Sequence, residues 1–244
     1  MVKSLLQRGD FFMGILSAFG WEVGTIGGAD LVRFGLAAVS GVLVLSAARW
    51  VYGRLPAGWL CDFDESPWEM HLPGLRGQGQ MGMKVVLWVL MSVRFLGGML
   101  DSGVIEILKT VICICAIVIS LCDADYMIVP DQFVAVIGGC AVALALVENA
   151  GGEMLYGALW GGGIMVLTSA IGLISGKGGA IGFGDVKLMA VCGAVAGERV
   201  FVLYVLMAVS SGVYFTLMVA AGKVKYGECQ PLGPWICGAM LLCL

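Results

Sequence analysis

The chain has few histidines, no closely paired cysteines of the kind that build structural metal sites, and few charges. Its 244 residues include one histidine, and its nine cysteines form no CxxC pair. A structural zinc site needs four cysteine or histidine ligands, which usually come in closely spaced pairs. Because the chain has no such pair, we do not expect a bound metal. Charged residues make up 13% of the chain, the formal net charge is −3, and no block of basic residues occurs. This charge pattern gives no sign of nucleic-acid binding.

Apolar residues dominate the composition. They make up 60% of the chain, and the mean hydropathy is +0.97. A soluble domain is usually about 45–50% apolar and about 25% charged. The 38 glycines follow no regular period and suit close packing of helices in lipid. The composition therefore predicts a multi-pass membrane protein surrounded by membrane lipid.

Apolar stretches recur along the chain, and a membrane helix needs about 20 mostly apolar residues. They are continuous rather than alternating, which predicts helices and not barrel strands. We expect an all-α polytopic helical bundle of about seven or eight membrane segments, at roughly 31–52, 83–100, 104–122, 132–147, 154–174, 186–197 and 200–221, with a shorter stretch at 234–244. Residues 1–30 are expected to form an N-terminal, interfacial segment. Residues 31–244 would form the embedded domain, with a loop at about 53–82.

Counting these spans places several helix ends on one side of the membrane. If the first span ends on one side, the third, fifth and seventh spans end there too. That side then carries eight basic residues and the other side four: Arg49, Arg54, Arg76, Lys84, Lys177, Lys187, Lys223 and Lys225 against Lys3, Arg8, Arg33 and Arg199. Because cytoplasmic loops are enriched in basic residues, we expect the first side to be the cytoplasm.

Two acidic motifs lie on that side, where apolar spans meet loops. The first is CDAD at 122–125, and the second is GFGDVK at 182–187. Carboxylates are costly in or beside a bilayer, so their presence indicates a function. Two neighbouring carboxylates cannot both ionise easily, so one keeps a proton. The ionised member can take a proton from water while the protonated member polarises a peptide carbonyl, without a metal or cofactor. The motifs therefore predict a membrane aspartic protease.

Several nearby residues are candidates for supporting roles. Gly182 and Gly184 flank a bulky phenylalanine, and glycine tolerates unusual dihedrals and close approach of another backbone. Lys187 could support the negative charge of the site or face lipid headgroups. Asp125 could assist the site or be a solvated acid. Asp131, at the start of the fourth span, is expected to be an N-cap or an interfacial anchor.

Two other classes of protein remain open. An ion-coupled secondary transporter also uses membrane carboxylates and glycine-broken helices. An inverted repeat would favour that class, but the two acidic motifs differ in spacing and context. A purely structural membrane subunit would leave Asp123 and Asp185 without a purpose.

At these residues the chain resembles the type IV prepilin peptidase family, a group of GxGD intramembrane aspartic proteases. The family carries an aspartate seven residues before Pro-Asp or Pro-Asn, as Asp123 precedes Pro130-Asp131 here, and residues 182–188 match its GFGDVKL run. RLP at 54–56 and PLGP at 231–234 are weaker matches. The resemblance covers roughly 40–240.

The resemblance implies that Asp123 and Asp185 are the two catalytic aspartates. Gly182, Gly184, Lys187, Asp125 and Pro130 are the candidates for supporting roles. The implied substrates are prepilins or pseudopilins, cut after a basic leader peptide at the cytoplasmic face of the bacterial inner membrane. Proteolysis would need no cofactor. Many relatives also methylate the new N-terminus with S-adenosylmethionine, and that activity is left open here.

The chain departs from the family in one respect. Longer members carry two CxxC pairs that bind zinc in the loop after the first span, whereas this loop holds only Cys61. The resemblance therefore points to a short form with no zinc.

Overall fold

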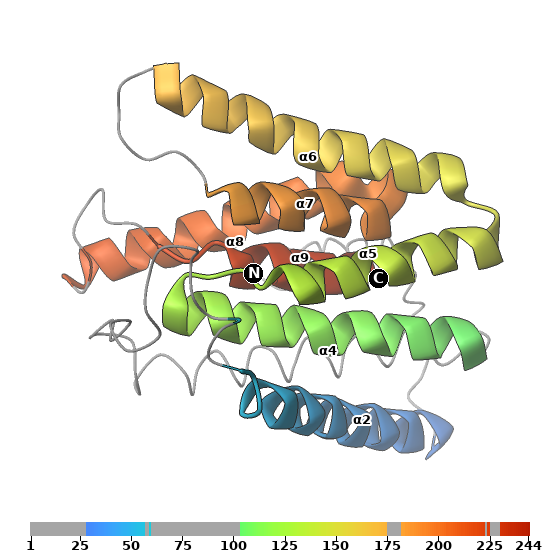
Figure 1. Cartoon of the computed structure of the whole chain (residues 1–244). Helices are drawn as coiled ribbons and strands as arrows, with labels where there is room; N and C mark the ends of the chain where they lie inside the picture. The colour runs from blue at the N-terminus through green and yellow to red at the C-terminus, as the bar shows by residue number, and fades with distance from the viewer. Residues whose placement is uncertain (1–27, 57–58, 60–102, 175–181, 223, 225–229) are drawn as a thin grey trace, which may run out of the picture.

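The structure is a computed structural model that describes residues 28–56, 59, 103–174, 182–222, 224 and 230–244 (Figure 1). The expected span at 83–100, most of the loop at 53–82 with Cys61, and residues 1–27 lie outside this part. The described residues form helices joined by turns, with no strand among them: α2 (Gly28–Tyr52), α4 (Gly103–Tyr126), α5 (Asp131–Glu148), α6 (Gly151–Ile174), α7 (Phe183–Ala196), the short 3-10 helix η3 (Gly197–Arg199), α8 (Val200–Ala220) and α9 (Gly233–Cys243). The predicted all-α class is confirmed.

Five described stretches are long and apolar enough to cross a membrane: 35–52, 103–126, 131–148, 151–174 and 183–220. The last stretch joins α7, η3 and α8, which were expected as two separate spans. Helix α7 has 14 residues, about 21 Å at 1.5 Å per residue, which is short of a bilayer core. The total of seven or eight segments therefore remains a prediction.

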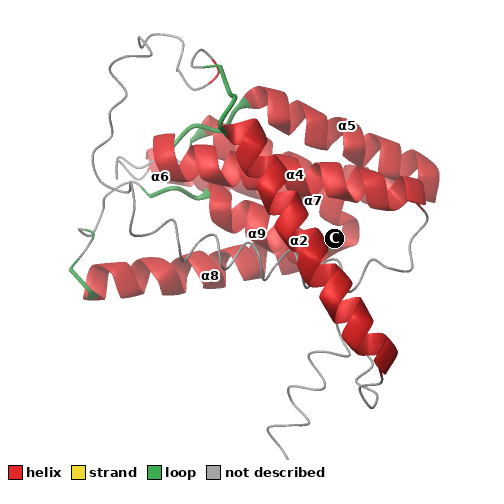
Figure 2. Ribbon diagram, turned by 90° about the horizontal axis from the view of Figure 1, so that it is seen from below, coloured by secondary structure: helices red, strands yellow, loops and turns green. Residues whose placement is uncertain are grey.

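The bundle is centred on α4, which packs against α2, α5 and α9 (Figure 1). Seen from below, α2 crosses α4 at an angle on the outside (Figure 2). Almost every residue of α4 from Ile112 to Asp123 is buried. A helix that is apolar all round is expected at the centre of a bundle, where no face meets the surroundings.

Helix α6 has the opposite character. Its buried residues form one stripe at Gly157, Gly161 and Met165, while apolar side chains such as Leu159 (74% exposed) point outward. Such an apolar exterior is the arrangement expected of a surface that faces lipid.

The buried stripe of α6 lies on α7 because both helices present glycine. A Cβ on Gly161 would lie 2.5 Å from the carbonyl oxygen of Met189, and Gly157 and Gly193 meet backbone to backbone more closely still. Any side chain at these positions would force the helices apart. The predicted use of glycine for close helix packing is confirmed at this crossing.

The chain reverses direction at η3, where Gly197 adopts a left-handed φ of 57°. At one end of the bundle Arg199 donates a hydrogen bond to the carbonyl oxygen of Cys243, 3.2 Å away. At the other end the ring of Tyr214 packs on Trp235, with centroids 4.9 Å apart. Helix α8 therefore runs antiparallel to α9, and the ends of α2, α4 and α8 share one end of the bundle with the starts of α5, α7 and α9 (Figure 1).

Candidate active site

Asp123 lies in the last turn of α4 and is 5% exposed. The helix stops just beyond it, where Met127 adopts a left-handed φ of 55° and donates its N–H to the carbonyl oxygen of Asp123, 2.9 Å away. A left-handed residue is a common helix C-terminus, although glycine usually occupies it. The last turn of this mostly apolar helix therefore holds a carboxyl group inside the bundle.

Asp185 lies in the first turn of α7 and is half-buried. Its N–H donates to the carbonyl oxygen of Gly182, which precedes the helix. Gly182 has φ −59° and ψ 143°, a conformation that any residue adopts. Its dihedrals therefore give no reason for glycine at this position.

Gly184 allows the loop between α4 and α5 to approach α7. A Cβ on Gly184 would lie 3.2 Å from the Cβ of Val129. Val129 belongs to the loop that follows the first acidic motif, so the contact joins the two motifs. The close approach predicted at Gly184 is present, but the neighbouring group is the side chain of Val129 and not a backbone.

The carboxyl groups of Asp123 and Asp185 lie close enough for their charges to interact. They come from different helices, one ending and one beginning at the same end of the bundle. Two acids that share a buried space repel each other when both are ionised, which favours a state with one proton between them. The structure therefore brings together the two aspartates that the motifs predicted.

A third element reaches Asp123 from far along the chain. The backbone N–H of Gly233, the first residue of α9, donates to Asp123 Oδ2 at 2.7 Å in a buried position. In the sequence, residues 231–234 are only a weak match to the family pattern and carry no predicted role. Pro234 next to a glycine before an apolar run is a signal for a helix start. That signal does not predict that the helix start binds Asp123.

Asp125 is bound by a neighbouring helix. The hydroxyl of Tyr52, the last residue of α2, donates to Asp125 Oδ2 at 2.6 Å. Asp125 is half-buried, so this bond ties α2 to the acidic motif. Of the two interpretations left open for Asp125, the simple solvated acid does not fit these surroundings.

Lys187 directs its charge toward Asp131. Its Nζ lies 2.8 Å from Asp131 Oδ2 and 4.9 Å from the centre of the Phe183 ring. Of the two roles expected for Asp131, the N-cap is wrong: Pro130 is the N-cap of α5, and no side-chain hydrogen bond caps this helix. The physical reason is that Asp131 already lies inside the first turn of α5. There its negative charge interacts favourably with the positive end of the helix dipole, and its carboxylate reaches Lys187. The interfacial anchor stays a prediction.

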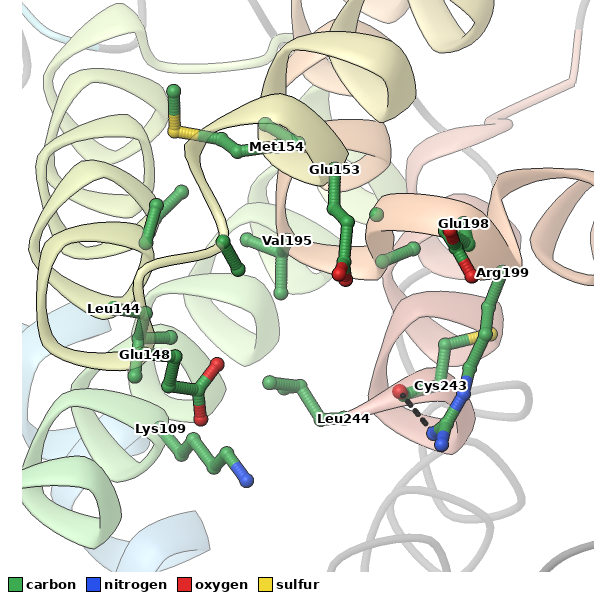
Figure 3. A pocket seen from close by; sticks show the side chains of 16 residues that line it. Lys109, Leu144, Glu148, Glu153, Met154, Val195, Glu198, Arg199, Cys243 and Leu244 are labelled. Atoms are coloured by element: carbon green, nitrogen blue, oxygen red, sulfur yellow. Dashed lines mark hydrogen bonds between the residues drawn. The ribbon is translucent and has the colours of Figure 1, made fainter.

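Among the described residues, no group of three or more histidine, cysteine, aspartate or glutamate side chains could hold a metal ion. The described end opposite the two aspartates holds a cavity of about 370 Å³ (Figure 3). Its five charged lining residues come from four different elements: Lys109, Glu148, Glu153, Glu198 and Arg199. The three glutamates are exposed.

Residues 110–217 match the sequence model of the type IV leader peptidase family. The matched residues, called the leader peptidase segment below, contain Asp123, Asp185 and both glycines of the second motif, but not Gly233.

Over 125 residues the chain is 34% identical to a prepilin leader peptidase/N-methyltransferase of Stutzerimonas stutzeri. The match covers 48% of this chain and 42% of that relative. The chain thus aligns with less than half the length of a curated leader peptidase. No solved structure matches the chain with significance.

Proposed function

We propose that this protein is a membrane aspartic endopeptidase that removes the basic leader peptide of type IV prepilins or pseudopilins. The observation that carries the proposal is the placement of Asp123 and Asp185 at one end of an apolar bundle, close enough for their charges to interact. Both aspartates belong to the leader peptidase segment. Carboxyl groups withdrawn from water in this way are typical of catalytic acids and bases.

The reaction uses one ionised and one protonated aspartate. The ionised aspartate takes a proton from water, and the water oxygen attacks the carbonyl carbon of the scissile peptide. The protonated aspartate donates a hydrogen bond to the carbonyl oxygen and stabilises the tetrahedral intermediate. When the C–N bond breaks, a proton from the pair passes to the leaving nitrogen. No cofactor takes part.

The site would face the cytoplasm of a bacterial inner membrane. The count of basic residues on the two sides supports this orientation. The substrate's hydrophobic helix would lie in the bilayer beside the bundle, with its basic leader at the cytoplasmic face. The bilayer would then fix the depth of the scissile bond relative to the aspartates.

N-methylation is a second candidate activity, because the similar Stutzerimonas stutzeri protein is named as a methyltransferase as well as a peptidase. It would require S-adenosylmethionine. Mass spectrometry of the processed pilin tests it: a gain of 14 mass units at the new N-terminus supports methylation, and an unmodified N-terminus rejects it.

Co-expression with a panel of prepilins and pseudopilins tests the peptidase proposal. Cleavage is read as a size shift on a gel, for wild type, Asp123→Asn and Asp185→Asn. Glu153→Gln, an acid at the other end of the bundle, is the matched control. We expect cleavage by wild type and control only, with all four proteins inserted equally. Cleavage by the Asn variants would reject the dyad, and an inserted wild type that cleaves no precursor would favour an ion-coupled carrier.

A further inference from the structure

We propose that the backbone N–H of Gly233 is a positioning group for Asp123, so that the start of α9 completes the catalytic pair. This inference rests on the proposed peptidase function. It assigns a role to a residue that lies outside the leader peptidase segment at 110–217. The argument has three parts: the bond itself, the space around it, and the rigidity of its donor.

The bond joins residues 110 positions apart in the chain and is buried, with 2.7 Å between the Gly233 nitrogen and Asp123 Oδ2. A hydrogen bond to a carboxylate is shorter and stronger than one between neutral groups. Away from water, a carboxyl oxygen that lost this donor would have no ready replacement. The bond therefore holds one oxygen of Asp123 in place and leaves the other for water and for Asp185.

Only glycine fits at the donor position. A Cβ on Gly233 would lie 2.8 Å from Asp123 Oδ2 and 3.1 Å from its Cβ and Cγ. A real Cβ does not come this near to a carboxyl group, so a side chain would push the carboxyl of Asp123 or the start of α9 away. The glycine is thus needed for the approach of the donor, independently of any dihedral angle.

The donor is free to serve Asp123 because of its place in α9. The first N–H groups of a helix have no partner within the helix, and Pro234 has no N–H. The next two N–H groups, of Trp235 and Ile236, donate to the carbonyl oxygen of Leu232. The N-terminal dipole of α9 also favours a negative charge at this position.

Burial holds α9 rigidly. Ile236, Cys237 and Met240 are fully buried against the core, and Trp235 packs on Tyr214. A donor on such a helix keeps its position through the reaction, which is the condition for orienting a catalytic group. A displacement of about 1 Å at a reacting group costs about 100-fold in rate.

The first test asks whether Gly233 and Asp123 touch, and it does not depend on any activity. Thermal unfolding of the full chain in detergent is measured for Gly233→Ala, Asp123→Ala and the double variant. Overpacking should lower the Tm by about 5 °C in the wild-type background. With the carboxyl removed, the same alanine should lower the Tm by less than about 2 °C, since such coupling marks a direct contact. Equal losses in both backgrounds would overturn the proposal.

The second test asks whether the contact serves catalysis. Prepilin cleavage is measured for Gly233→Ala and for Gly163→Ala, a control in α6 whose added Cβ meets nothing within 4 Å. We expect kcat of Gly233→Ala to fall about 100-fold. KM should change less than about twofold, because a positioning group acts on Asp123 and not on the bound substrate. Gly163→Ala should match wild type. A folded Gly233→Ala variant with wild-type kcat would overturn the positioning role.

The two proposals fail in distinguishable ways. If wild type cleaves no precursor but the Tm values show coupling, the peptidase proposal fails and Gly233 still positions Asp123. If wild type cleaves and the coupling is missing, the peptidase stands and the role of Gly233 is rejected.

Discussion

Both ends of the bundle carry acidic residues, but these residues differ in burial and in their hydrogen-bond partners. At one end Asp123 is buried, bound by a backbone N–H and close to Asp185. At the other end Glu148, Glu153 and Glu198 are exposed around a cavity that also receives Lys109 and Arg199. Exposed acids keep their contact with water, whereas neighbouring acids withdrawn from water repel each other when both are ionised. Burial and mutual proximity, and not the number of acids, make one end the candidate for catalysis.

The largest expected effect comes from removing the pair. Asp123→Asn and Asp185→Asn should each lower the rate of cleavage by about 100- to 10,000-fold, as the loss of general acid–base catalysis does. The double variant should be no slower than either single variant, since residues that act as a unit are not additive. Single-turnover rates on one prepilin measure all three.

At the opposite end, Glu148→Gln and Glu198→Gln should retain cleavage within about twofold, because loss of a solvated charge removes no reacting group. A rate loss there comparable with that of the Asn variants would remove the functional difference between the two ends.

The pH dependence should expose the shared proton. At low pH both aspartates are protonated, so neither accepts a proton from water, and at high pH both are ionised, so neither donates to the carbonyl oxygen. The rate of cleavage should therefore fall by about tenfold per pH unit on each side of a maximum. The two sides of this curve report the titration of the aspartates as a pair and not of either residue alone. Initial rates across several pH units check this, and Glu153→Gln should leave the curve in place. A flat profile would exclude the shared-proton mechanism.

A steric change at the α6–α7 crossing should weaken the fold without altering the acids. Gly193→Ala places a Cβ against the backbone of Gly157 and Gly161. Overpacking of this kind costs about 1–3 kcal/mol, so the midpoint of thermal unfolding in detergent should fall. Gly139→Ala, in open space on α5, is the matched control. Equal stability of the two variants would mean that the glycine contact is not needed.

The tie between α2 and the first acidic motif should matter less. Tyr52→Phe removes the hydroxyl that binds Asp125, and a hydrogen bond to a charged group contributes about 1.5–3 kcal/mol. The free energy of unfolding should fall by about that amount or less, while cleavage persists. Tyr156→Phe, whose ring packs on Trp160 and Phe201, controls for loss of a hydroxyl elsewhere. A complete loss of cleavage in Tyr52→Phe would place Tyr52 in the reaction itself.

The smallest effect is expected at the ion pair of Lys187 and Asp131. Both side chains are exposed, at 37% and 64%, and exposed ion pairs contribute about 0.2–1 kcal/mol. Lys187→Met and Asp131→Asn should therefore change unfolding and cleavage slightly and by similar amounts. A large loss of cleavage in Lys187→Met alone would show that the lysine acts on the aspartate pair.

The helices could be predicted closely from the chain alone. The apolar stretch expected at 104–122 is α4 at Gly103–Tyr126, and the one expected at 154–174 is α6 at Gly151–Ile174. Apolar continuity over about 20 residues is a local property, so it can be read without knowledge of packing. The two acidic motifs were found for the same reason, because charges stand out in an apolar chain.

The partners of these residues could not be predicted. Tyr52 with Asp125 and Lys187 with Asp131 are 73 and 56 positions apart in the chain. A hydrogen bond or ion pair depends on which helix ends meet, and helix faces and crossing angles decide that. The N-cap expectation at Asp131 failed for a local reason, since Pro130 is the N-cap and Asp131 already lies in the first turn of α5.

The amino-acid order was thus sufficient to specify an all-α membrane bundle and the two acidic motifs at helix ends, because helix length, apolar continuity and the position of a charge are written along the chain. Packing of the helices decided the rest: it buried Asp123, brought it close enough to Asp185 for their charges to interact, and placed the N–H of Gly233 against its oxygen. The physical reason is that burial and hydrogen bonding depend on which surfaces exclude water together, and that is settled in three dimensions.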